Sequence, residues 1–130
     1  IGPLPASKRG KRYILTIVDH FTRFSYAVPC ERADAATAAR AFVKFCYLYS
    51  CPREVLTDNG THFTAEFMER VMDLMAIHHR FTLAYNPRAN GMNEKFNGTL
   101  QTLLRRAVYG KPQDIWDQLI RACTFAYNTT

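Results

Sequence analysis

The spacing of apolar residues changes near residue 34, and this change limits the folds open to the chain. Before it, residues 12–19 form an almost continuous apolar run and residues 23–29 alternate, which predicts two antiparallel strands joined by a short link. After it, residues 34–50 carry apolar side chains at three- and four-residue spacing, with Asp34 as the expected N-cap. The chain therefore opens with a hairpin and continues into a helix.

The rest of the chain alternates between the two patterns. Strands are predicted at residues 53–58 and 77–83, and helices at residues 63–75, 91–108 and 112–127. The segment before the first strand resembles the arm of another hairpin, with Gly10 in its turn. An antiparallel hairpin followed by strand–helix–strand crossovers predicts a mixed α/β fold in a single domain, residues 1–130.

The composition of the chain indicates what kind of partner it binds. The 130 residues carry a formal net charge of +6 and 48% are hydrophobic, which fits a domain with a real core and a polyanionic partner such as nucleic acid. No apolar run approaches the roughly 18 residues of a membrane span, so we expect no membrane association. The chain begins with Ile and ends without a helix cap, so both ends look cut from a longer protein.

The four cysteines indicate a reduced, intracellular protein. They stand at positions 30, 46, 51 and 123, with neither a Cys-x-x-Cys pair nor a Cys/His spacing suited to zinc. Two of them, Cys46 and Cys123, fall among apolar residues in helical patterns, where a buried free thiol is common.

Two carboxylates stand out as candidate site residues. Asp58 follows a strand and precedes Asn59-Gly60, so it either supports a turn or presents a catalytic or metal-binding oxygen at a strand end. Glu94 falls in the first turn of a predicted helix, where it is either a solvated acid favoured by the helix dipole or a group facing a groove. Thirty-five residues lie between Asp58 and Glu94.

This spacing and its flanking residues resemble the catalytic core of retroviral and long-terminal-repeat retrotransposon integrases. The residues that match the family's two segments are Thr57, Asp58, Asn59, Gly60 and Phe63, then Tyr85, Pro87, Gly91, Glu94 and Asn97. Residues 2–24 also look like the opening of integrases of the gypsy group, and the resemblance covers essentially the whole chain.

The resemblance implies a ribonuclease H-like fold with a mixed central sheet flanked by helices. It also implies DNA integration, in which water first cuts near the 3′ end of the element and the freed 3′-OH then attacks target DNA. Asp58 and Glu94 are the implied catalytic residues and ligands of Mg²⁺ or Mn²⁺ in a two-metal site, because hard cations prefer carboxylate oxygens.

The first carboxylate of the family's triad falls upstream of this chain, about two residues before Ile1, so the two-metal site is incomplete here and activity is left open. Asp19 is a further candidate, since a hairpin about Arg9 and Gly10 is expected to bring it across from that upstream position. A cross-strand structural role for Asp19 is the favoured interpretation.

Partners follow from the same resemblance. The expected DNA-binding residues, for which an ordinary polar helix face is the alternative, are Arg88, Asn93, Lys95, Asn97 and Arg105. The DNA would be the element ends and the target, and the protein a homodimer or higher multimer in the nucleus, a virus-like particle or the cytoplasm. The helix at 112–127, with Trp116, is a candidate dimer surface; burial of Trp116 in the domain's own core is the alternative.

Two other functions compete. One is an inactive or domesticated integrase-like module, derived from a retroelement, that binds DNA or protein. The other is a ribonuclease H-like nuclease that only hydrolyses, which fits the 35-residue spacing less well. The alternatives share one fold and differ in chemistry.

Overall fold

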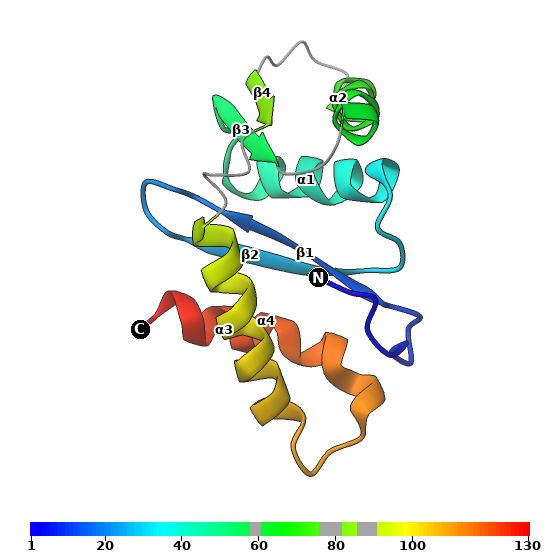
Figure 1. Ribbon diagram of the computed structural model, residues 1–130, viewed down its shortest axis with the longest axis vertical. Coiled ribbons are helices and arrows are strands. Elements are labelled where there is room, and N and C mark those ends of the chain that lie inside the picture. The colour runs from blue at the N-terminus through cyan, green and yellow to red at the C-terminus, as the bar shows by residue number, and fades with distance from the viewer. Residues whose placement is uncertain (58–60, 76–81, 86–90) are drawn as a thin grey trace. The chain divides into compact units, whose positions relative to one another are not determined.

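The computed structural model describes residues 1–57, 61–75, 82–85 and 91–130. The chain divides into two compact units, which we call the terminal unit, Ile1–Arg32 with Gly91–Thr130, and the central unit, Ala33–Asn90. Figure 1 labels their helices and strands. The predicted order of strands and helices along the chain is confirmed.

The terminal unit is built on the predicted hairpin. Strands β1 (Tyr13–Val18) and β2 (Ser25–Cys30) pair antiparallel along their whole length. The segment before β1 also folds back on it: the Ile1 amine donates to the Ile14 carbonyl at 2.9 Å, and the Ile14 amide donates to the Ile1 carbonyl at 2.9 Å. Gly10, at φ 79°, lies in the connecting turn, where a left-handed conformation favours glycine. This confirms the additional hairpin arm.

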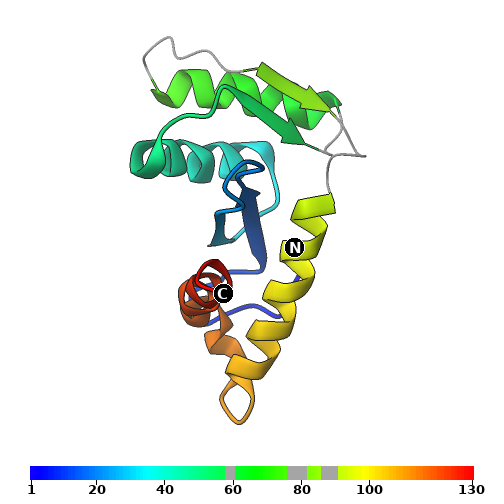
Figure 2. The same ribbon diagram turned by 90° about the vertical axis from the view of Figure 1, so that its left-hand side faces the viewer.

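Two helices cover this hairpin. Helix α3 (Gly91–Val108) contacts β1, and α4 (Trp116–Asn128) contacts β2. Figure 2 shows the chain passing from α3 into α4 through the short 3-10 helix η2 (Gln113–Ile115). The helix predicted at 112–127 therefore opens with a tighter turn before its regular part begins.

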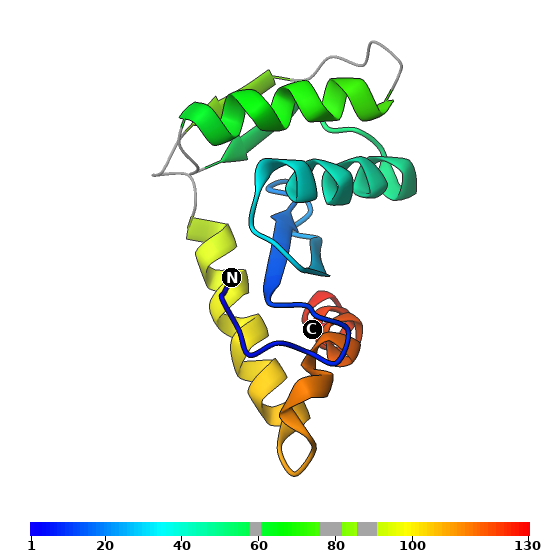
Figure 3. The same cartoon turned by 90° about the vertical axis from the view of Figure 1, so that its right-hand side faces the viewer.

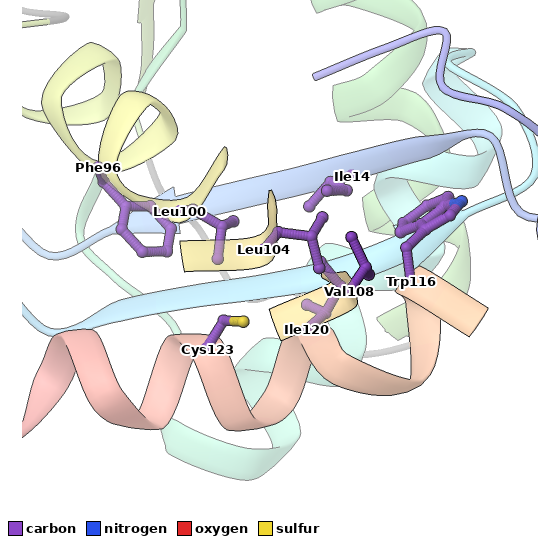
Figure 4. Packing of buried hydrophobic residues seen from close by; sticks show 8 residues of the cluster. All are labelled: Ile14, Phe96, Leu100, Leu104, Val108, Trp116, Ile120 and Cys123. Atoms are coloured by element: carbon purple, nitrogen blue, oxygen red, sulfur yellow. The ribbon is translucent and has the colours of Figure 1, made fainter. Parts of the chain in front are cut away.

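The core of the terminal unit lies between β1 and the two helices. The residues drawn in Figure 4 are Ile14, Phe96, Leu100, Leu104, Val108, Trp116, Ile120 and Cys123. The α3 members recur every four residues, so they form one stripe along the helix. Phe96 and Leu100 have no exposed surface, and this stripe fixes which side of α3 faces β1.

The central unit contains helix α1 (Ala35–Tyr49), strand β3 (Glu54–Thr57), helix α2 (Thr61–Met75) and strand β4 (Thr82–Tyr85). Strands β3 and β4 pair in parallel, with α2 as the crossover between them. Helices α1 and α2 lie side by side (Figure 3). The strand expected at 77–83 is observed at Thr82–Tyr85, and residues 77–81 lie outside the described part.

Local chemistry explains this packing. Asp34 caps α1 as predicted, its carboxylate accepting from the Thr37 amide at 2.8 Å. Phe42 of α1 meets Phe67 of α2 edge-on, with ring centroids 5.4 Å apart. The buried faces of both helices thus meet in aromatic contacts.

Candidate active site

Glu94 lies in the first turn of α3 and its side chain is exposed. The positive end of the helix dipole favours a carboxylate here. Within the residues that the structure describes, no lysine or arginine forms an ion pair with Glu94. Its oxygens are therefore available to a cation. Asp58, the second implied ligand, lies outside the described residues.

Asn97 follows one turn later and is anchored to the sheet. Its Oδ1 accepts a hydrogen bond of 2.8 Å from the hydroxyl of Thr16 in β1. Asn97 and the next polar residue along this side of the helix, Gln101, are both half-buried, because they border the apolar stripe of α3.

Asn93 is also half-buried. Its Oδ1 is inaccessible to water and accepts no hydrogen bond within the described part of the chain. Leaving such an oxygen unpaired costs about 1–3 kcal/mol, so this atom is a local source of instability at the start of α3.

The remaining predicted DNA contacts divide in two. Lys95 and Arg105 are exposed on α3, and Arg88 lies outside the described residues. Sequence reasoning missed Arg106 and Tyr109, which are exposed at the end of the same helix. The sequence signal that could have pointed to them is a tyrosine placed three residues after a pair of adjacent arginines.

Asp19 directly follows β1, and its carboxylate oxygens accept hydrogen bonds within the turn that it begins. One oxygen accepts from the Phe21 amide at 2.9 Å and the other from the Thr22 hydroxyl at 2.9 Å. These two hydrogen bonds, the amide contribution being the larger, hold the pKa of Asp19 below its ordinary value of 3.8. The structure thus shows Asp19 supporting a turn, in place of the favoured cross-strand role.

The pairing of the N-terminal segment with β1 indicates which residue a position upstream of Ile1 would face. Ile1 and Ile14 exchange both backbone hydrogen bonds, so they are directly paired. Continuing that antiparallel ladder places a residue two positions before Ile1 opposite Thr16. Asp19 follows β1 and lies three residues beyond Thr16, so this register does not place it directly opposite that upstream position.

Trp116 belongs to the core of the terminal unit. It is 4% exposed, and its indole N–H donates to the Pro5 carbonyl at 2.8 Å. This supports the second of the two alternatives for that residue. The exposed side of α4 instead presents Gln118, Arg121, Ala122 and Phe125, of which Phe125 is 69% exposed.

Charge is divided unequally between the units. Residues 1–32 and 91–130 hold eleven of the 17 lysines and arginines but five of the 11 acids, so the terminal unit carries the whole net charge of +6. The central unit is formally neutral. A polyanion is therefore attracted to the terminal unit.

Two further features of the described residues concern metal binding and membrane spanning. These residues contain no group of three or more His, Cys, Asp or Glu side chains placed to hold a metal. None of their helices has the length and apolar character needed to cross a bilayer.

Comparison with known proteins finds a family and a fold. The integrase core domain model matches residues 1–87. The chain is 28% identical over 131 residues to the retrovirus-related Pol polyprotein from transposon 412 of Drosophila melanogaster, covering 100% of this chain and 10% of that protein. It is 29% identical over 130 residues to the Pro-Pol polyprotein of feline foamy virus, covering 100% and 11%. The chain thus spans about a tenth of these relatives.

Solved structures show the same fold. A simian T-cell lymphotropic virus intasome in complex with PP2A regulatory subunit B56 gamma matches 86% of this chain and 40% of its own, with a TM-score of 0.71 and 22% identity. The HTLV-2 integrase catalytic core in complex with magnesium, in its dimeric form, matches 86% and 71%, with a TM-score of 0.68 and 22% identity. These matches confirm the predicted ribonuclease H-like fold.

Proposed function

We propose, because the chain belongs to the integrase core domain family, that it is the catalytic core of a polynucleotidyl transferase of DNA integration. The reactions would be processing of the 3′ ends of an element and their transfer to target DNA. The observation that carries the proposal is the family match over residues 1–87. The exposed carboxylate of Glu94 at the start of α3 supports it from outside that match.

Asp58 and Glu94 are the proposed ligands of Mg²⁺ or Mn²⁺. The donor set fits such a cation, since carboxylate oxygens are the ligands that hard divalent ions prefer and Glu94 is exposed. When bound, two such ions would activate the attacking oxygen and stabilise the leaving oxygen. The HTLV-2 core with a similar fold was solved with magnesium.

The upstream carboxylate would complete this set. The ladder between Ile1 and Ile14 would place it opposite Thr16, whose hydroxyl holds Asn97. Asn97 lies three residues after Glu94 on α3, so the same strand that would receive the upstream acid also seats the helix that carries Glu94. We propose that the Thr16–Asn97 hydrogen bond helps to align the two.

The proposed partners are DNA and further copies of the protein. Lys95 and Arg105 are exposed and suited to phosphate, whereas Asn93 and Asn97 are half-buried and would contact DNA only at the edge of the site. A homodimer or higher multimer would use the exposed side of α4 around Phe125. The protein would act in the nucleus or in a virus-like particle.

The test is joining of a labelled DNA end to a target by the full-length polypeptide. Glu94→Gln should lower the joining rate by about a thousandfold or more, because a neutral amide keeps the shape but removes the charge that holds the cation. The control is Glu69→Gln, which neutralises an exposed acid on α2 of the central unit and should leave joining unchanged.

Three outcomes separate the alternatives. Near-normal joining by the Glu94→Gln variant would reduce Glu94 to a solvated helix residue. A wild-type protein that binds DNA but joins none, in either Mg²⁺ or Mn²⁺, would favour the domesticated binding module. Cleavage of DNA without joining would favour the nuclease.

A further inference from the structure

The end of α3 carries two arginines and a tyrosine around a hollow. Arg105, Arg106 and Tyr109 line a shallow, widely open depression of about 390 Å³ on the surface of the terminal unit, and we call this depression the hollow. Tyr109 is 87% exposed, and both arginine side chains are exposed beside it. Neither guanidinium is paired with a carboxylate of the described residues.

Helix stability explains only part of this arrangement. Cations in the last turn of a helix interact favourably with the negative end of its dipole, which accounts for Arg105 and Arg106 individually. It does not account for an aromatic ring left open to water next to them. Surfaces that hold a nucleic-acid strand combine arginine guanidiniums, an exposed aromatic ring and a net positive charge, and the end of α3 has all three.

We propose that this hollow binds a single-stranded nucleic-acid segment, with Arg105 and Arg106 on phosphates and Tyr109 stacked on an unpaired base. Planar guanidiniums bind phosphate oxygens through two hydrogen bonds at once. A base can stack on Tyr109 only where it is released from its neighbours, so the site selects unpaired strands over duplex. The proposal rests on the proposed function only in taking DNA as the ligand.

The experiment measures fluorescence anisotropy of a labelled 12-nucleotide oligo-dT and of a 12-base-pair duplex with the 130-residue chain. All solutions contain EDTA, so binding at the hollow is independent of metal and of catalysis. Failure of the joining reaction would therefore leave this result unaffected. Affinities are recorded over a series of salt concentrations.

Arg106→Gln should weaken oligo-dT binding and reduce the slope of log affinity against log salt by about 0.7, the value for one lost single-strand phosphate contact. The matched control is Arg32→Gln, which removes one exposed arginine of the same unit and should leave the slope unchanged. An equal effect of the two substitutions would show that binding follows net charge alone and would overturn the proposal.

Tyr109→Leu should weaken oligo-dT binding by about tenfold, the scale of one lost base stack, while duplex affinity and the salt slope stay the same. Tyr109→Phe keeps the ring and should bind as the wild type does. Loss of binding in both variants, or in neither, would overturn the stacking role. Thermal melts of each variant confirm that the changes in affinity occur in folded protein.

Discussion

At the scale of single residues, the contact between Thr16 and Asn97 is the one polar link described between β1 and α3. Thr16→Val keeps the side-chain shape but removes the donor to a half-buried amide oxygen. We expect the free energy of unfolding to fall by about 1 kcal/mol. Urea denaturation of the 130-residue chain measures it.

Thr102→Val is the matched control for Thr16→Val. Thr102 is exposed on α3, and its hydroxyl donates to the Gly98 carbonyl within the helix. Its replacement should change the free energy of unfolding by less than about 0.5 kcal/mol. Equal costs for the two substitutions would mean that the Thr16 hydroxyl does not seat α3.

Asp19 gives a prediction about pH. Its pKa is lowered in the folded state, so the charged carboxylate stabilises the fold above the unfolded pKa, and this contribution is lost as pH falls through the folded pKa. Asp19→Asn should therefore flatten the fall in melting temperature below about pH 4, while its amide oxygen still accepts from Phe21. The effect is small, because the group is exposed.

Melting temperatures of wild type and Asp19→Asn, measured between neutral and strongly acid pH, provide the comparison. The two curves should differ most near neutrality and converge at the acid end. Parallel curves would show that Asp19 gains nothing from its charge in the turn.

At the scale of elements, the N-terminal arm is held to η2 and the start of α4 by three contacts. The Arg9 guanidinium pairs with Asp117 at 2.8 Å, the Trp116 indole donates to the Pro5 carbonyl at 2.8 Å, and the Lys8 amide donates to the Asp114 carbonyl at 2.9 Å. The Asp117 side chain is fully buried, and Arg9 is the cation that pairs with it. The N-terminal arm thus has a fixed position in the terminal unit.

Arg9→Gln should lower the free energy of unfolding by about 1–3 kcal/mol, because it leaves a buried carboxylate without its ionic partner. The exposed part of the Arg9 side chain is screened by water, which keeps the cost below that of a fully buried pair. Lys8→Gln, which removes the neighbouring exposed cation, should be nearly neutral. A Lys8→Gln variant as unstable as Arg9→Gln would point to general charge rather than to this pair.

The helices were the elements best predicted from sequence. Helix α3 begins at Gly91 and ends at Val108 as expected, because its apolar residues recur at regular helical spacing. The strand near residue 80 was harder, since a short apolar run sets no clear boundary, and its described part is Thr82–Tyr85. Spacing could not show that Asn97 is half-buried, because periodicity gives a face of the helix and tertiary packing decides how far burial extends beyond it.

At the scale of the whole molecule, sequence identified the fold through Asp58 and Glu94, whose spacing of 35 residues led to the family. On the surface of the terminal unit it pointed to Lys95 and Arg105 but not to Arg106 or Tyr109. Arg106 and Tyr109 became a site only once the structure placed both on the rim of one hollow. Likewise, the alternatives for Trp116 could be separated only by its hydrogen bond to Pro5, more than a hundred residues away in sequence.

The central claim is that Asp58 and Glu94 hold one divalent cation, and paramagnetic broadening by Mn²⁺ tests it most directly. In the ¹⁵N-labelled chain, the backbone amides of Gly60 and Lys95 should broaden together at the same Mn²⁺ concentration. Glu94→Gln should abolish both effects, and Glu69→Gln neither. Binding should be weak, and it should tighten when the upstream strand with its acid is present. Broadening at Gly60 that survives Glu94→Gln, or that occurs without broadening at Lys95, would contradict the account.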